Sequence, residues 1–330
     1  MTRPSALVGP DTVPSADAAA IETGALALVR EGEIRLRLTG SGRVACLQGL
    51  ITSDVAKSGE GSRSFGALLT NKGMIVAPLW ISRLSDATLL ELPAAAASAV
   101  HEVFAKSLPP RLCRSEDVTG TTIALGVYGP RASEVLARVL GPFPAGAAEV
   151  SYASGRVAIA PAVLRGVGGF DLVAGAGLAR ALMDDLLGQG ATAGSATALE
   201  RARILAGIPR LGAEIDDRTL PQEVRYEELG AISFTKGCYL GQETVARIHF
   251  RGHANRRLAG LALEDAPASL PQELRAEGRA VGRLTSAAWM PDLGRWFALG
   301  IIRRELAAGA EIATDLGATA TVLADPWTAA

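Results

Sequence analysis

The chain has 330 residues, of which 48% are hydrophobic and 20% are charged, and its 33 basic residues are matched by 34 acidic ones. This length and composition indicate a soluble globular protein of two or three domains. The formal net charge of -1 excludes a chain-wide attraction to nucleic acid or to an anionic membrane, and no stretch approaches the roughly 18 consecutive apolar residues of a membrane-spanning helix.

The N-terminal 20 residues carry three prolines and a glycine and contain no apolar run of useful length, so they do not read as a signal peptide. We expect residues 1–20 to form a flexible tail. The first predicted strand is EIRLRLTG, residues 33–40, in which apolar and charged residues alternate. This period of two is typical of a strand with one face in water. A short helix is expected after it, within residues 43–55.

Residues 66–84 and 88–92 are predicted to be strands, and the first segment turns at Asn71, Lys72 and Gly73. Because asparagine and glycine tolerate positive φ, we expect a β-hairpin there. Four later segments have the composition of helices, and each lies near a glycine that can end it. They are AAAASAVHEVFAKS, RASEVLARVLG, LARALMDDLLGQG and ATALERARILAG.

The segments VAIAP, AVLRG and FDLVAG supply predicted strands between these helices. Strands and helices therefore interleave through the first 210 residues, which favours an α+β body over a purely parallel sheet. From about Leu258 onward, short β-type segments are separated by Gly, Pro and Asp. This pattern predicts a small β-barrel or sandwich as a separate domain.

The three cysteines are Cys46, Cys113 and Cys238. An odd and sparse set without CxxC spacing argues against a disulfide framework and against a cysteine-built structural zinc site. A reducing, cytoplasmic setting fits this usage best.

The segment SFTKGCYLGQETVARIHFRGH, residues 233–253, gathers one of the three cysteines and two of the three histidines. A thiol reacts or ligates as thiolate, and a nearby cation lowers its pKa from about 8.5. Lys236 lies two residues before Cys238, and Gly237 and Gly241 bracket the cysteine. Such glycines permit positive φ and a close approach of a ligand or a second chain segment. We interpret Cys238 as a working thiol and Lys236 as its cation, against the alternative that Cys238 is a small buried hydrophobe.

A helix is predicted to begin near Gly241, with Gln242 and Glu243 in its first turn, where a carboxylate is favourable. Glu243 and Arg247 have the i, i+4 spacing of an intrahelical ion pair, so an ordinary helix pair explains them equally well.

Metal binding is the competing interpretation, because Cys238, His249 and His253 could supply sulfur and nitrogen ligands. The spacing C-x10-H-x3-H lacks the second cysteine of a zinc finger. We therefore expect no metal site, and we expect His249 and His253 to be surface or strand residues that follow the helix. His101, on an alanine-rich helix, is expected to be structural.

KGCYLGQE followed by Arg247 resembles the signature of the YgfZ-type folate-binding proteins, which include a mitochondrial factor for iron–sulfur cluster assembly. CLQGLITSDV, ALLTNKGMIVAPLW and RILAGIPRLGAEIDD are similar to further segments of that family, and AVGRLTSAAWMPDLGRWFALGII resembles the C-terminal barrel of the glycine-cleavage aminomethyltransferase. The resemblance covers roughly residues 24–326.

This resemblance implies a three-domain ring around a central hole that holds tetrahydrofolate. Two interleaved, ferredoxin-like α+β units would occupy residues 21–250, and a β-barrel would occupy residues 251–330. Asp171 in GGFDLV stands where the transferase relatives carry an acidic residue that binds the pterin ring, a role that suits a carboxylate. The alternative is a charged residue at a strand end. Arg203 in RILAG matches an arginine that would hold the glutamate tail of folate, or else is an exposed helix cation.

Two departures from the transferase pattern stand out. Leu205 and Ala206 occupy the place of an acidic residue, and the expected region of the catalytic aspartate reads LELPAAAASAVHE, with alanine or serine throughout. General acid or base catalysis commonly contributes a factor of about a hundred or more. Turnover as an aminomethyltransferase is therefore left open rather than expected.

The resemblance thus implies a cytoplasmic, monomeric tetrahydrofolate-binding accessory protein that supports iron–sulfur cluster assembly or repair in client enzymes, including tRNA-modifying ones, without binding nucleic acid itself. Cys238 would be its working thiol, Tyr239 would pack beside the ligand, and Gln242 with Glu243 would orient the loop. The alternatives are a folate-dependent aminomethyltransferase and a non-catalytic folate-binding scaffold.

Overall fold

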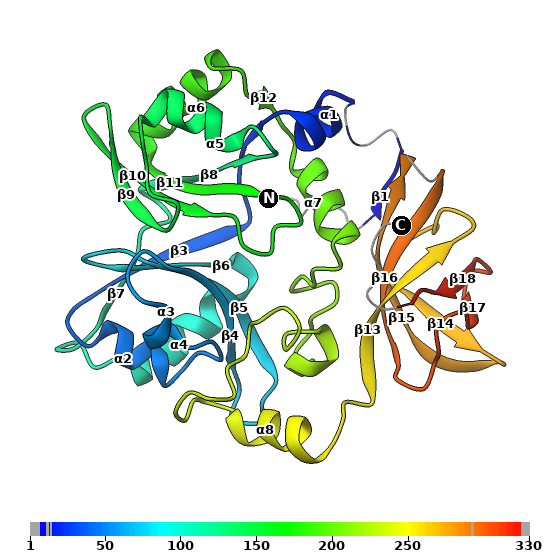
Figure 1. The fold of residues 1–330 in the computed structure, drawn as a ribbon. Coiled ribbons are helices and arrows are strands. Elements are labelled where there is room, and N and C mark those ends of the chain that lie inside the picture. The colour runs from blue at the N-terminus through cyan, green and yellow to red at the C-terminus, as the bar shows by residue number, and fades with distance from the viewer. Residues whose placement is uncertain (1–6, 11–12, 14, 292–293, 325–330) are drawn as a thin grey trace.

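The computed structural model describes residues 7–10, 13, 15–291 and 294–324. Three β-sheets form three bodies, two on one side of the molecule and one on the other (Figure 1). Residues 206–241 run between them and contain one short 3-10 helix, η2 (Pro221–Val224). In the part of the chain that the structure describes, no helix is long and apolar enough to cross a membrane.

The lower sheet has five strands in the order β4-β5-β6-β3-β7. The elements of this body are β3 (Glu33–Thr39), α2 (Arg43–Gln48), α3 (Val55–Ser58), β4 (Arg63–Leu69), β5 (Ile75–Arg83), β6 (Thr88–Pro93), η1 (Ala94–Ala96), α4 (Ala97–Ser107) and β7 (Arg114–Asp117). The predicted hairpin is confirmed: β4 pairs with β5, and Gly73 in the turn has φ +83°.

The upper sheet has six strands in the order β12-β2-β8-β11-β10-β9. The elements of this body are α1 (Ser15–Thr23), β2 (Leu26–Val29), β8 (Thr122–Tyr128), α5 (Ala132–Leu140), β9 (Ala148–Tyr152), β10 (Gly155–Pro161), β11 (Gly169–Gly175), α6 (Ala176–Gly188), β12 (Thr192–Ala193) and α7 (Ala196–Leu205). Strands β2 and β8 are neighbours in this sheet, yet the whole lower sheet lies between them in sequence. The two α+β units are therefore interleaved, as expected.

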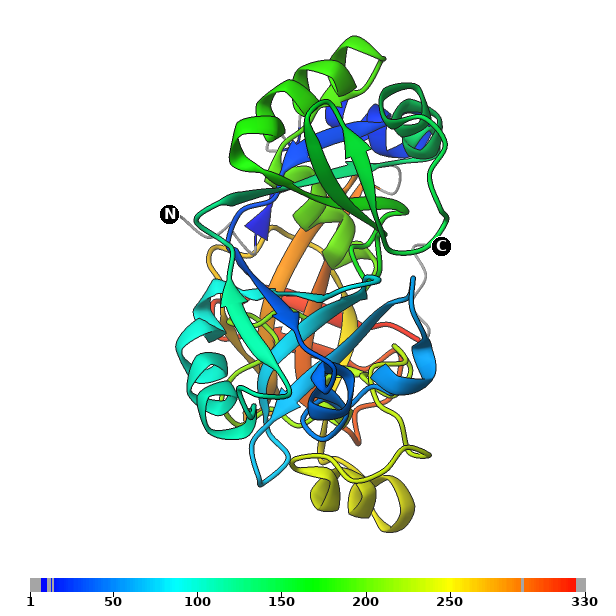
Figure 2. The same cartoon turned by 90° about the vertical axis from the view of Figure 1, so that its left-hand side faces the viewer.

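Figure 2 shows the two α+β bodies one above the other with the barrel behind them. This stacking corrects the expectation for residues 33–40. The strand β3 forms, but Arg35 on its supposed wet face is only 5% exposed, and its guanidinium donates to Thr119 and Thr122. The alternation of charged residues here reflects contact between two bodies rather than contact with water.

AVLRG, residues 162–166, is not a strand, so that prediction is wrong. Leu164 and Gly166 have φ values of +52° and +85°, which interrupt an extended chain. A Cβ at Gly166 would lie 2.4 Å from backbone atoms of Ala202, so the loop packs directly on α7. The other two predicted strands of this region correspond to β10 and β11.

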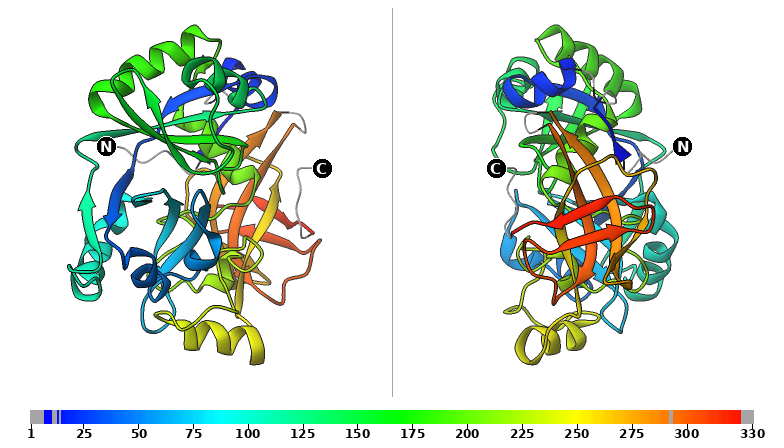
Figure 3. Two further views of the ribbon diagram at one scale, coloured as in Figure 1. Left: turned by 60° about the vertical axis from the view of Figure 1, so that its left-hand side comes forward. Right: turned by 90° about the vertical axis from the view of Figure 1, so that its right-hand side faces the viewer.

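The third body is the predicted barrel. Its strands are β13 (Arg256–Leu263), β14 (Gln272–Ala276), β15 (Arg279–Met290), β16 (Arg295–Arg303), β17 (Glu311–Thr314) and β18 (Thr319–Val322). The order β15-β14-β17-β18-β13-β16 closes because β16 also pairs with β15, and Figure 3 shows the last strands crossing over the others.

Part of the expected N-terminal tail is ordered. Strand β1 (Leu7–Val8) pairs in parallel with β15, opposite Ala287 and Ala288, and residues 15–23 form α1. The composition of residues 1–20 could not predict this pairing, because a strand of two residues forms only through its hydrogen bonds to β15. Residues 1–6, 11–12 and 14 lie outside the described residues.

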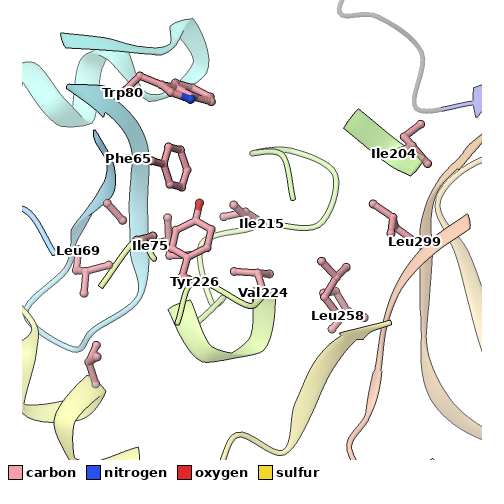
Figure 4. Close-up of a cluster of buried hydrophobic side chains, with 14 of the residues drawn as sticks. Phe65, Leu69, Ile75, Trp80, Ile204, Ile215, Val224, Tyr226, Leu258 and Leu299 are labelled. Atoms are coloured by element: carbon pink, nitrogen blue, oxygen red, sulfur yellow. The ribbon is translucent and has the colours of Figure 1, made fainter. Parts of the chain in front are cut away.

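An apolar cluster, here called the central cluster, joins the lower sheet, residues 206–241 and the barrel (Figure 4). Its aromatic members are Phe65, Trp80, Tyr226, Tyr239 and Phe297. Phe65 contacts both Trp80 and Tyr226, with ring centroids 5.1 and 5.4 Å apart. Ile204, on α7 of the upper body, also belongs to the cluster, so this shared core holds the three bodies around residues 206–241.

Candidate functional site

Cys238 is exposed in the loop that precedes α8 (Gln242–Arg251), and its thiol is free. The predicted helix start near Gly241 is confirmed. By contrast, Cys113 is buried in the lower body, where burial raises the pKa of its thiol to about 11. Of the three cysteines, Cys238 is therefore the most exposed residue.

Lys236 is bonded to the backbone of a distant segment of the chain. Its side chain is 8% exposed, and its ammonium donates to the carbonyl oxygens of Ile51 (2.6 Å) and Ser53 (2.8 Å). The ammonium also lies 5.2 Å from the ring centroid of Tyr239. Burial lowers the pKa of Lys236 to about 8, although the nearby Asp54 carboxylate acts in the opposite direction. The described contacts show Lys236 anchoring the loop to residues 51–53.

Two glycines allow the loop to approach the β4–β5 hairpin closely. Gly241 has φ +82°, and a Cβ there would lie 2.4 Å from the carbonyl oxygen of Thr70. A Cβ at Gly73, on the hairpin, would lie 2.9 Å from the Thr244 side chain. The Leu240 amide also donates to the Gly49 carbonyl (3.1 Å). The loop is thus a fixed platform that presents Cys238 to solvent.

Gln242 and Tyr239 complete the platform. The Gln242 side chain accepts a hydrogen bond from the Tyr239 amide (3.3 Å). Tyr239 is 6% exposed, and its hydroxyl has no hydrogen-bond partner within the described residues. Burial raises the pKa of this hydroxyl to about 12.

Glu243 and Arg247 do not form the expected ion pair within the described part of the chain, and both side chains are exposed. The Glu243 carboxylate and the Arg247 guanidinium are therefore accessible to a binding partner.

His249 is an exposed surface residue, one of the two expected possibilities, but it lies in the last turn of α8 and not after the helix. Its ring stacks on Phe234 at 3.7 Å and contacts the Glu227 carboxylate at 3.0 Å. His253 is exposed beyond the helix. Across the described residues, no group of three His, Cys, Asp or Glu side chains could hold a metal ion.

Asp171 is buried between the upper and lower sheets, in contact with three arginines. Its carboxylate lies 2.6 Å from Arg30, 2.7 Å from Arg63 and 3.0 Å from Arg165, and it accepts a hydrogen bond from the Tyr128 hydroxyl (2.7 Å). Burial alone would raise the pKa of Asp171, but the three guanidinium groups outweigh it and lower the pKa.

Two further carboxylates balance this cluster. Glu33 pairs with Arg30 and Arg165, and Glu91 pairs with Arg30 and Arg63. Three cations therefore meet three anions in a buried network, here called the arginine–carboxylate network. The Asp171 side chain is 1% exposed, and both of its oxygens are bonded within this network. Asp171 is therefore buried more deeply than an ordinary charged residue at a strand end.

Arg203 is also buried, which rules out the exposed helix cation weighed for it. Its guanidinium donates to Glu200 (2.8 Å), Glu214 (3.1 Å) and the Ser286 hydroxyl (3.0 Å) on β15. It also donates to the Ile208 carbonyl. Arg203 thus connects α7 to the barrel.

No sequence pattern pointed to the hydroxyl of Tyr226 at the centre of the molecule. Its side chain is fully buried in the central cluster, and within the described residues this hydroxyl has no hydrogen-bond partner. Burial raises its pKa. Nearby, the Arg165 guanidinium lies 3.9 Å from the ring centroid of Trp80. Aromatic residues far apart in sequence meet here, and their spacing could not have predicted it.

A pocket of about 520 Å³ opens beside the central cluster, between the lower body and the barrel. Ile75 and Ile215 belong to both the pocket and the cluster. Its wall includes Ala95, Ala96 and Ala99, which follow β6 where the sequence lacks the expected catalytic aspartate. Its carboxylates come instead from residues 216–217, and Asp216 lies 3.3 Å from Arg283.

Comparison with known proteins identifies the architecture. The family model described as the GCVT N-terminal domain matches residues 17–232, and the glycine cleavage T-protein C-terminal barrel domain matches residues 256–327. The chain belongs to the glycine cleavage T-protein family. The expected three-body α+β fold with a C-terminal barrel is confirmed.

Individual relatives narrow the resemblance. The "tRNA-modifying protein YgfZ" of Cronobacter sakazakii is 30% identical over 82% of this chain and 83% of its own length, which confirms the likeness to YgfZ-type proteins. A chloroplastic protein of Arabidopsis thaliana is 27% identical over 87% of this chain, which spans only 66% of that protein. The crystal structure of the aminomethyltransferase T from Bartonella henselae shares the fold, with a TM-score of 0.82, 22% identity, and coverage of 94% of this chain and 88% of that one.

Proposed function

We propose that this protein is a tetrahydrofolate-binding accessory protein that supports iron–sulfur cluster assembly or repair in client enzymes, including tRNA-modifying ones. The observation that carries the proposal is the exposed Cys238, held on a fixed platform within a glycine cleavage T-protein fold. The proposed setting is the cytoplasm, where three unpaired thiols stay reduced.

The pocket beside the central cluster is suited to folate, whereas the two residues expected to bind it, Asp171 and Arg203, are bonded elsewhere. The pocket beside the central cluster has a volume within the usual range of small-molecule sites, about 300–1,000 Å³. Ile75 and Ile215 give it an apolar wall, behind which the central cluster packs, and residues 216–217 and Arg283 add polar groups for orienting a ligand. Asp171 and Arg203 are already bonded, so we assign them the positioning of the surrounding bodies.

The pocket and the cysteine loop share one structural element. Thr70 lines the pocket, and its carbonyl oxygen lies against Gly241 at the start of α8. A ligand in the pocket would therefore contact the same hairpin that supports Cys238. This arrangement gives a physical route by which folate binding could hold the thiol in a defined position.

In the proposed function, Cys238 is the group that touches the client, and Lys236 fixes the loop through the carbonyls of residues 51–53. Glu243 and Arg247 lie exposed on the first turns of α8 and are available to a partner. Reduced folate supplies one-carbon chemistry when bound, and the residues described here bind and orient it.

Aminomethyl transfer is the second candidate, favoured by the family to which the chain belongs. Against it, Ala95, Ala96 and Ala99 form the pocket wall where the aspartate is expected, so no carboxylate at that place can assist a proton transfer. A scaffold without turnover is the third candidate. Incubation with a methylamine-loaded carrier protein tests the second, since robust folate-dependent turnover would displace our leading assignment.

Calorimetric titration with tetrahydrofolate tests the pocket. We expect binding by the native protein, weakened in Ala99→Trp, which fills the pocket from its wall, and unchanged in Tyr152→Phe, whose hydroxyl is bonded to Asp185 in the upper body. An absence of heat with the native protein would leave the scaffold as the best assignment.

Complementation tests the thiol. In cells that lack their own YgfZ-type factor, we expect native protein and Cys46→Ser to restore the activity of an iron–sulfur client enzyme, and Cys238→Ser to fail. The Cys238→Ser protein should fold and bind folate normally, because the side chain is exposed. Full rescue by Cys238→Ser would remove the thiol from the mechanism.

A further inference from the structure

A second hollow, here called the basic groove, lies on the barrel beyond the end of α8. Its volume is about 750 Å³, and it is lined by Arg256, Arg303, Arg304, Glu305 and His253 and by residues 280–282. None of these residues lines the pocket beside the central cluster. The proposed folate function therefore does not use this groove.

Strand register concentrates positive charge here. Arg256 on β13 lies directly opposite Arg303 on β16, and Arg304 follows with its amide bonded to the carbonyl of Asn255. Like charges directly opposite one another on paired strands destabilise a sheet. The chain nevertheless has a net charge of only -1, so this concentration is local and does not reflect a generally basic composition.

The acidic residues nearby neutralise only part of this charge. Glu223 binds Arg256 through both carboxylate oxygens, each at 2.9 Å. Glu305 approaches Arg303 at only 3.5 Å, and the Arg303 side chain is 61% exposed. Within the described ranges, Arg304 and His253 have no ion-pair partner. Arg303, Arg304 and His253 thus remain available to an anion.

The shape of the groove indicates the size and character of that anion. A volume of about 750 Å³ falls in the upper part of the range for small-molecule sites, about 300–1,000 Å³. Ala280, Val281 and Gly282 provide an apolar surface beside the charged groups. Guanidinium forks match the oxygens of a phosphate, and two arginines with a histidine suit its three terminal oxygens better than the two of a carboxylate.

We propose that the basic groove binds a small organic phosphate of about nucleotide size. The phosphate contacts Arg303, Arg304 and His253, and the organic part lies over residues 280–282. This site lies outside the pocket proposed for folate, and its occupation requires no change in the cysteine loop.

Calorimetric titration with 5′-AMP, inorganic phosphate and adenosine tests the proposal in the full-length protein. We expect 5′-AMP to bind, inorganic phosphate to bind more weakly and adenosine not to bind. The affinity for 5′-AMP should fall as salt rises, because the contacts are exposed charge pairs. Arg303→Ala and Arg304→Ala should each weaken 5′-AMP by about tenfold, as expected for a charged hydrogen bond.

Arg279→Ala is the matched control, since Arg279 is an exposed arginine at the start of β15 that does not line the groove. It should bind 5′-AMP like the native protein. Three results would overturn the proposal. They are no binding of 5′-AMP at about 10 mM, equal binding of adenosine, and unchanged 5′-AMP binding in the double variant of Arg303 and Arg304.

Two further titrations separate this site from others. A single-stranded oligonucleotide that binds far more tightly than 5′-AMP would overturn the small-molecule assignment in favour of nucleic acid. Tetrahydrofolate should not compete with 5′-AMP, and competition would merge the groove with the folate site. Failure of the folate titration alone leaves the 5′-AMP result intact, so the two proposals fail separately.

Discussion

Replacing Asp171 by alanine should destabilise the protein far more than the loss of one surface carboxylate. Asp171 contacts Arg30, Arg63 and Arg165 and is 1% exposed. Its removal leaves three buried guanidinium groups with two carboxylates, and breaking a buried pair in this way costs about 3–5 kcal/mol. Since domains are stable by about 5–15 kcal/mol, this is a large fraction of the total.

Urea denaturation followed by circular dichroism measures the effect. The control is Asp86→Ala, because the Asp86 side chain is 66% exposed and pairs with Arg37 at 3.0 Å; such a surface pair contributes about 0–1 kcal/mol. The double variant Asp171→Ala/Arg63→Leu restores the charge balance and should recover part of the loss. Arg63 is the guanidinium to remove, because burial lowers its pKa to about 10.

The pH dependence has a definite sign. The pKa of Asp171 is lower in the folded protein than in the unfolded chain, so its contribution is present above the unfolded pKa of about 3.9 and is lost as pH falls toward the folded value. The stability difference between native protein and Asp171→Asn should therefore shrink below about pH 4. A cost below about 1 kcal/mol for Asp171→Ala, equal to that of Asp86→Ala, would refute the reasoning.

Four further outcomes follow from the site. Gly241→Ala should cost about 1–3 kcal/mol in urea, because its φ is +82° and its Cβ would meet backbone, whereas Gly237→Ala, with open space around it, should change stability little; equal effects would contradict the close contact. Cys238 should be the first thiol alkylated by iodoacetamide in native protein, and mass spectrometry that finds another cysteine modified first would count against its role. Burial lowers the pKa of Lys236 to about 8, so above that pH the unfolded chain binds more protons than the folded protein. The stability of native protein relative to Lys236→Met should therefore rise between pH 8 and 10. A stability difference that does not change with pH would contradict the lowered pKa. Tyr226→Phe should raise the stability of the ligand-free protein by about 1 kcal/mol, because it removes a buried unpaired hydroxyl, and a loss of similar size in thermal melting would indicate a missed partner.

Much of the architecture could be predicted from local sequence signals. The hairpin at Asn71 to Gly73, the four helices after residue 93 and the start of α8 all follow from turn residues, helix composition and helix-ending glycines. The loop at residues 162–166 could not be predicted, because its positive φ values depend on packing against α7. Strand β1 likewise depends on a partner about 280 residues later in sequence.

The site was predictable only in part. The motif pointed to an exposed Cys238, since glycines and a helix start are local features. It could not show that Lys236 reaches the carbonyls of residues 51 and 53, because this contact joins segments far apart in sequence. The same limit applies to Asp171, whose neighbours come from both sheets, and to Tyr226, whose burial depends on three bodies meeting.

The pairing of β1 with β15 has a consequence for how the molecule can be divided. Residues 7–8 are hydrogen-bonded to the barrel, and the next elements of the chain, α1 and β2, enter the upper body. The barrel is therefore tethered to the rest at two separate places, near residue 10 and near residue 252. A fragment cut at residue 251 would lose β1, and in the excised barrel Ala287 and Ala288 of β15 would have a strand partner on one side only, a short exposed edge that favours self-association.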